Sequence, residues 1–172
     1  MTAAANALNL EHLNHCDAPA FVAALGGAFE HSPWVAEAAC AQRPFASVNA
    51  LHAAMIGAVR ALPPQRQVAF LCQHPELAGK EAQAGTMTDH STAEQAGLNA
   101  LSRAEVEELH RLNAAYHERH GFPFVIAVLA NTKAQIFDAL RLRTGNSTEQ
   151  ERNAALDQIG VITRLRLARL FQ

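Results

Sequence analysis

The sequence predicts an all-α fold, a single compact domain of roughly seven to nine helices over residues 1–172. Alanine and leucine dominate the chain, and runs of β-branched residues are scarce. Signals that start and stop helices recur at helical intervals. Hydrophobic residues make up 49% of the 172 residues, which is far above a disordered composition and suits one sizeable core.

In the first third of the chain, polar caps and prolines delimit the predicted helices. Asp17 is suited to cap a helix that runs to Gly26, and Ser32 places a cap directly before a first-turn proline. Ser47 opens an apolar-periodic stretch that Pro63 stops. These signals predict a series of separate helices in this part of the chain.

A short helix is predicted from Gln65 to Cys72. Because Pro75 disfavours helical geometry in the residue before it, we expect His74 at the end of this helix or just past it. Residues 78–90 are predicted to form a loop.

Further along, a capping box at Ser102 predicts a long helix that Gly121 ends. Residues 122–128 (FPFVIAV) are strand-like, but the stretch is short and has no obvious pairing partner. We interpret it as a buried extended turn that leads into a helix. Thr132 would cap that helix over residues 133–144.

The last helix, predicted over residues 148–170, has an arginine inside its apolar stripe. At about 100° per residue, Arg166 falls on the same face as Ile159 and Ile162, whereas Arg164 projects away from it. A buried arginine keeps its charge and so needs an anion or several acceptors. Three interpretations follow: a structural salt bridge, snorkelling to the surface, or a two-pronged grip on a substrate carboxylate or ureido oxygen.

The overall composition argues against several classes of partner and location. The formal net charge of −2 gives no reason to expect nucleic acid or an anionic membrane, and no apolar run is long enough to span a bilayer. Residues 1–10 lack the features of a secretory signal, and the last three residues are not a peroxisomal signal. Cys16, Cys40 and Cys72 form no CxxC pair, which indicates reduced thiols and a cytoplasmic protein.

Polar groups suited to proton transfer occur close together near the middle of the sequence. Residues 74–77 read HPEL, and residues 91–95 read STAEQ. A histidine, a carboxylate and two neutral hydrogen-bonding side chains suffice for proton transfer without a metal. Taken alone, His74 also fits a structural helix end, and Ser91 with Glu94 also fits a capping box.

Two histidine pairs have the spacing of helical metal ligands, His12 with His15 and His117 with His120. Both pairs are expected on polar, exposed faces, without carboxylates to support them. No metal site is therefore predicted.

The order and spacing of several short motifs resemble the family of 2-oxo-4-hydroxy-4-carboxy-5-ureidoimidazoline (OHCU) decarboxylases, the last enzymes of the route from urate to (S)-allantoin. These motifs are HPEL at 74–77, STAEQ at 91–95, Asn113-x-x-Tyr116 leading into GFPFVI at 121–126, and LRL at 165–167. The resemblance implies an all-helical, commonly dimeric decarboxylase that acts on OHCU and uses no cofactor.

The resemblance also implies a role for individual residues. His74 would be the acid/base residue, Glu94 would orient His74 or a polar substrate group, and Arg166 would hold substrate and stabilise developing negative charge. Further contacts with substrate would come from a larger set of residues: Pro75, Ser91, Thr92, Ala93, Gln95, Phe124, Ile126, Ala127, Val128, Leu129 and Ala130.

Two alternatives to a decarboxylase stay open at the level of sequence. A hydrolase acting on a cyclic ureide could use the same histidine and glutamate to position water. A non-catalytic helical interaction module would carry Arg166 as a structural ion pair and His74 as a helix stop.

Overall fold

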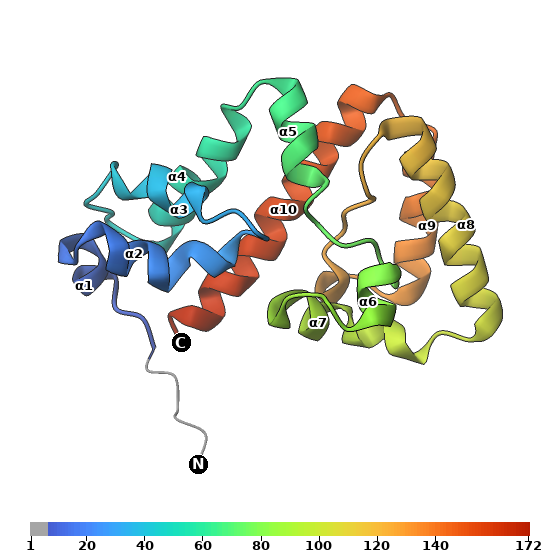
Figure 1. Cartoon of the computed structure of the whole chain (residues 1–172), viewed down its shortest axis with the longest axis horizontal. Coiled ribbons are helices and arrows are strands. Elements are labelled where there is room, and N and C mark those ends of the chain that lie inside the picture. The colour runs from blue at the N-terminus through green and yellow to red at the C-terminus, as the bar shows by residue number, and fades with distance from the viewer. Residues whose placement is uncertain (1–6) are drawn as a thin grey trace, which may run out of the picture. The chain divides into compact units, whose positions relative to one another are not determined.

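The computed structural model describes residues 7–172, and every regular element within them is a helix (Figure 1). The all-α prediction is thus confirmed. The described residues form ten α-helices and three short 3-10 helices. The number exceeds the predicted seven to nine because the chain also forms short helices, such as the five-residue α6 (Lys80–Ala84).

The chain divides into two compact units, one formed by the residues up to Leu62 together with Ile162–Gln172, and the other by Pro63–Val161. We call them the N-terminal unit and the central unit. The long helix α10 (Thr148–Leu170) contributes residues to both. The expectation of one domain over residues 1–172 remains a prediction.

The N-terminal unit contains α1 (Leu10–His15), α2 (Ala18–Leu25), η1 (Gly26–Ala28), α3 (Trp34–Cys40) and α4 (Val48–Arg60), drawn from blue to blue-green in Figure 1. Helix α3 packs against both α2 and α4. The predicted caps are confirmed, because Asp17 accepts from the Ala20 amide (2.8 Å) and Ser47 from the Ala50 amide (3.1 Å). Helix α3 differs slightly from expectation, since its N-cap is Pro33 instead of Ser32.

The central unit contains α5 (Pro64–Leu71), α6, α7 (Asp89–Gln95), η2 (Ala96–Ala100), α8 (Arg103–His120), η3 (Val128–Ala130), α9 (Lys133–Thr144) and the first part of α10. Helix α8 opens with the predicted capping box at Ser102 and ends at Gly121, whose φ of 80° suits glycine. Thr132 caps α9 as predicted.

Two segments of the central unit test the sequence predictions most directly. The predicted loop over residues 78–90 is wrong in part, because it contains α6 and the first residues of α7. Residues 122–127 form no strand but a buried, non-helical segment that leads into η3 at Val128, in line with the interpretation from the sequence.

Three further findings bear on the sequence expectations. The three cysteines are free. Among residues 7–172, no helix combines the length and the apolar character that crossing a membrane requires. The expectation about a leader in residues 1–10 falls partly outside the described residues.

Candidate active site

His74 lies one turn beyond the end of α5, where the sequence predicted it. Its amide donates to the carbonyl of Leu71 (3.1 Å), which extends the helical path past the last α-helical residue. The residue is 8% exposed, and its ring meets the Phe70 ring edge-on at 5.5 Å between centroids. His74 is thus buried at a helix end and leads directly into Pro75.

Gln95 ties the segment after His74 to helix α7. Its side-chain oxygen accepts from the Ala78 amide (3.0 Å), and its side-chain nitrogen donates to the Glu76 carbonyl (3.4 Å). The Gln95 carboxamide, which was predicted to bind substrate, is therefore already hydrogen-bonded to the backbone that follows His74.

The capping-box interpretation of Ser91 and Glu94 is wrong. Thr88 is the N-cap of α7, because its hydroxyl accepts from the Ser91 amide (3.3 Å) while its own backbone is extended. Ser91 instead lies inside the first turn of the helix and is 3% exposed, whereas Glu94 is half-buried. Thr92 and Ala93, also predicted to contact substrate, are exposed on the same helix.

The segment from Phe124 to Ala130 passes next to this helix, since α7 packs against η3. Phe124, Ile126 and Ala127 are buried, Val128 is half-buried, and Leu129 and Ala130 are exposed. The central unit therefore brings together three of the predicted segments: the turn after His74, helix α7 and the segment that ends in η3.

Several peptide groups of this segment already have protein partners. The Ala127 amide donates to Gln158 (3.0 Å), and the Ala127 carbonyl accepts from Asn131 (2.8 Å). The Val125 carbonyl accepts from Arg143 (2.9 Å). A substrate that bonded the backbone of Ala127 would therefore have to share its amide with Gln158 or its carbonyl with Asn131.

A buried polar network that the sequence analysis missed supports the same segment. Glu151 is fully buried and accepts from the Tyr116 hydroxyl (2.6 Å), from Arg143 (2.9 Å) and from Asn146 (2.7 Å). The guanidinium of Arg143 also lies over the Phe124 ring, 4.5 Å from its centroid. Charged residues near helix ends look solvated in a sequence, so only the burial seen in the structure identifies this cluster.

Removing the hydroxyl at this network is expected to weaken the fold. Tyr116→Phe should lower the free energy of unfolding by about 1–2 kcal/mol, because Glu151 loses a buried donor. Burial, followed by the hydrogen bond to Glu151, raises the pKa of Tyr116 far above its usual range. Wild type should therefore lose stability above pH ~10, where tyrosine in the unfolded chain ionises, and Tyr116→Phe should lack this contribution.

Urea unfolding at neutral and alkaline pH measures both effects, with the exposed Glu149→Gln as the control variant. Equal stability of Tyr116→Phe and wild type at neutral pH would show that the hydroxyl contributes nothing.

Arg166 lies in the N-terminal unit, where the predicted salt bridge is observed. Its Nη1 donates to the Glu30 carboxylate (3.1 Å) and to the Ala28 carbonyl (3.2 Å). Both side chains are almost fully buried, at 2% exposure for Arg166 and 1% for Glu30. Ile159 on the same stripe is buried and Arg164 is exposed, as the helical projection predicted.

The histidine pairs only partly match expectation. His12, His15 and His117 are exposed as predicted, but the expectation for His120 is wrong, since it is 4% exposed. The expectation that no carboxylate lies beside these pairs is wrong for His117, whose Nδ1 is 3.7 Å from the Glu76 carboxylate. His120 is buried because its ring packs on Tyr116 (4.6 Å between centroids) and approaches the Thr148 hydroxyl (3.2 Å). Over the described part of the chain, no group of three His, Cys, Asp or Glu side chains could hold a metal ion.

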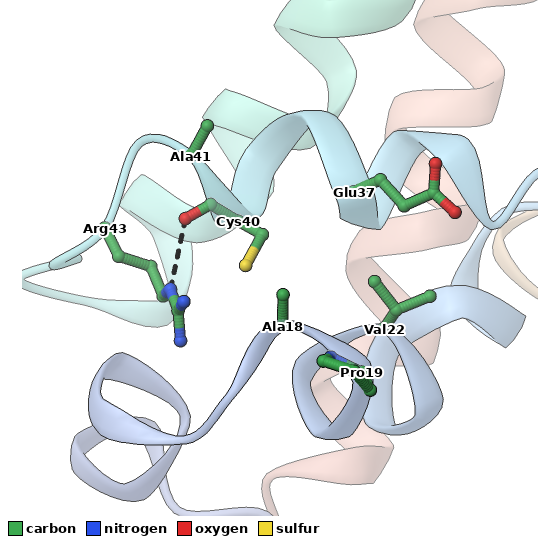
Figure 2. A pocket seen from close by; sticks show the side chains of 7 residues that line it. All are labelled: Ala18, Pro19, Val22, Glu37, Cys40, Ala41 and Arg43. Atoms are coloured by element: carbon green, nitrogen blue, oxygen red, sulfur yellow. Dashed lines mark hydrogen bonds between the residues drawn. The ribbon is translucent and has the colours of Figure 1, made fainter.

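The N-terminal unit also contains a groove of about 560 Å³ between α2 and α3 (Figure 2), which includes none of the predicted site residues. Two charged side chains line it, Glu37 and Arg43, and Arg43 is hydrogen-bonded to the backbone. Arg43 donates to the carbonyls of Leu13 (3.0 Å), Cys16 (2.6 Å) and Cys40 (3.1 Å). Because none of the candidate acid/base residues lines this groove, the central unit is kept as the candidate active site.

The buried His74 lies just before a turn that Gln95 of α7 bonds, and the same helix carries Ser91 and Glu94. Such a set of side chains is suited to acid/base catalysis. A profile of the OHCU decarboxylase family matches residues 14–168. The 2-oxo-4-hydroxy-4-carboxy-5-ureidoimidazoline decarboxylase of Haloferax volcanii is 44% identical over 95% of this chain and 96% of its own length. The chain belongs to the OHCU decarboxylase family.

Two further relatives agree with this assignment. The uric acid degradation bifunctional protein PucL of Bacillus subtilis is 42% identical over 92% of this chain, which spans 32% of that longer protein. A crystal structure of (S)-allantoin synthase superposes with a TM-score of 0.75 at 30% identity, covering 95% of this chain and 54% of that one.

Proposed function

We propose that this protein converts OHCU to (S)-allantoin and carbon dioxide in urate degradation, with His74 as the acid/base residue and without a cofactor. The observation that carries the proposal is the match to a named decarboxylase at 44% identity over nearly the whole of both chains. The buried His74 and the half-buried Glu94 of α7 supply the acid/base groups that such a reaction needs.

The chemistry of the substrate explains why no cofactor is required. The carboxylate of OHCU sits on a carbon that bears a hydroxyl and adjoins a ring C=N bond. When the carbon–carbon bond to the carboxylate breaks, its electron pair moves toward the C=N nitrogen, which takes up a proton. The enol that results loses its hydroxyl proton and gains a proton on carbon, so one proton is consumed overall and one stereocentre is formed.

In this proposal, each catalytic side chain handles charge or a proton at a defined stage. His74 moves the proton at the hydroxyl or at the new stereocentre. Glu94 orients His74 or a polar group of the substrate. Arg166 holds an anionic group of the substrate and stabilises developing negative charge. Pro75, Ser91, Phe124 and the residues from Ile126 to Ala130 supply walls and polar contacts.

The decisive experiment uses fresh OHCU, made by oxidising urate enzymatically and opening the product. Addition of the protein should give a circular dichroism signal of one allantoin enantiomer, faster than the spontaneous reaction. Racemic product at the spontaneous rate would overturn the proposal. Release of carbon dioxide without consumption of water distinguishes the decarboxylase from the alternative, a hydrolase of a cyclic ureide.

Cofactor independence gives a second prediction. Because the C=N bond of the substrate accepts the electrons, turnover should be unchanged after exhaustive treatment with a chelator. Activity is measured before and after chelation, with metal content determined in both samples. Loss of activity that zinc or manganese restores would contradict this mechanism.

The role of Glu94 is tested by removing only its charge. Because Thr88 caps α7, Glu94→Gln should leave the melting temperature unchanged while lowering kcat by about tenfold or more. Asp89→Asn is a matched control, since it makes the same chemical change at an exposed position of the same helix. Unchanged turnover in Glu94→Gln would remove Glu94 from the catalytic set.

We further propose that the protein acts in the cytoplasm as a homodimer. Three free thiols support a reducing compartment. The homodimer is what the resemblance to a commonly dimeric family implies.

A further inference from the structure

The four residues after Pro75 form a tight turn with an unusual backbone. The Gly79 amide donates to the Glu76 carbonyl (3.1 Å), which closes the turn. Ala78 has a φ of 48°, a left-handed conformation that alanine rarely adopts. A Cβ at Gly79 would lie 2.7 Å from that of Glu76, so the turn leaves no space for a side chain there. Such a turn needs support from its surroundings.

Side chains from three helices provide this support by bonding the backbone of the turn; from α6, Gln83 Nε2 donates to the Ala78 carbonyl (3.4 Å). From α7, Gln95 holds the Ala78 amide and the Glu76 carbonyl. From α8, Asn113 donates to the Leu77 carbonyl (3.0 Å), and His110 Nε2 lies 2.9 Å from the Ala78 carbonyl. In this contact the carbonyl accepts and the tautomer of His110 with a proton on Nε2 donates; the same Nε2 also lies 3.2 Å from Gln83 Nε2.

The contacts from α8 come from one face of that helix. His110, Asn113 and His117 are spaced three and four residues apart, so their side chains project on the same side. His117 approaches the Glu76 carboxylate at 3.7 Å. Asn113 is 4% exposed, so its bond to the turn is shielded from water. The sequence resemblance included Asn113 without giving it a role.

We propose that Asn113 and His110 are positioning residues that fix the acid/base residue His74 through the turn Glu76–Gly79. Only Pro75, whose φ is locked by its ring, separates His74 from this turn, so a shift of the turn moves His74 as well. A small displacement of a catalytic group is enough to lower kcat strongly. The inference rests on the proposed acid/base role of His74.

The test compares variants that loosen the turn in different ways. His110→Leu removes one of the two side-chain donors to the Ala78 carbonyl and leaves Gln83 in place, and His110→Gln retains a donor at a similar reach. Ala78→Gly removes the strain at φ 48° and with it some rigidity. Asn113→Leu removes the buried donor. Arg111→Gln, on an exposed face of the same helix, is the control.

We expect His110→Leu and Asn113→Leu to lower kcat by on the order of tenfold with little change in KM, and His110→Gln to restore most of it. Ala78→Gly should lower kcat although its melting temperature stays equal or rises. In the free protein, the NMR titration of the His74 ring should shift in His110→Leu and Ala78→Gly but not in Arg111→Gln.

The outcomes separate this inference from the proposed function when His74→Ala is assayed in parallel. If His74→Ala is inactive but His110→Leu and Ala78→Gly keep wild-type kcat and an unshifted titration, only the positioning role is overturned. If His74→Ala retains turnover, the acid/base role fails and the positioning role fails with it. A proportional loss of melting temperature and kcat in His110→Leu, without rescue by His110→Gln, would show a merely structural contact.

Discussion

His74→Ala is expected to lower kcat by about 10² or more, the usual scale for loss of a general acid/base. The loss should appear in kcat more than in KM, because the imidazole acts on protons during the reaction and contributes little to binding. Circular dichroism with fresh OHCU measures both constants. The product should also lose optical purity, because protonation in solution has no facial preference.

Burial of His74 makes a structural control necessary. Its ring packs against Phe70, so truncation to alanine also removes packing. His74→Gln keeps bulk and polarity but cannot shuttle a proton, and it should be as inactive as His74→Ala with a melting temperature closer to wild type. His12→Ala is the matched control at an exposed histidine. Turnover in His74→Gln within about threefold of wild type would remove His74 from the catalytic set.

Local signals predicted much of the fold. Asp17, Ser47, Ser102 and Thr132 all cap helices as expected, because a cap depends on a few neighbouring residues. The same reasoning placed His74 past the end of α5, since Pro75 restricts the residue before it. It failed at Ser91, because Thr88 three residues earlier offers an equally good cap.

Interactions between residues far apart in the chain could not be predicted from the sequence. The projection of α10 identified Arg166 as buried, but nothing in the pattern points to Glu30, 136 residues away, as its partner. Likewise, Glu151 looks like an ordinary first-turn acid, whereas the structure buries it under Tyr116 and Arg143. Charge pairing inside a core depends on which elements meet, and local periodicity does not specify that.

Arg166 is expected to affect both stability and turnover, and its pairing with Glu30 determines how the two effects are separated. Arg166→Met alone should lower the free energy of unfolding by about 3–5 kcal/mol, because it leaves the Glu30 carboxylate buried without its cation. Loss of activity in this variant would therefore be ambiguous. Arg164→Ala, two residues away but exposed, should stay within about 0.5 kcal/mol of wild type in stability and keep full turnover.

Two other variants resolve the ambiguity. The double variant Arg166→Met/Glu30→Gln removes both charges, so it should regain most of the lost stability, since replacing a whole buried pair is often neutral. Arg166→Lys keeps a charge beside Glu30 but not the planar, two-pronged guanidinium. If Arg166 binds substrate, both variants fold well and both lose turnover by about tenfold or more. Turnover that instead recovers together with stability in the double variant would make Arg166 a structural partner of Glu30 and remove it from the catalytic set.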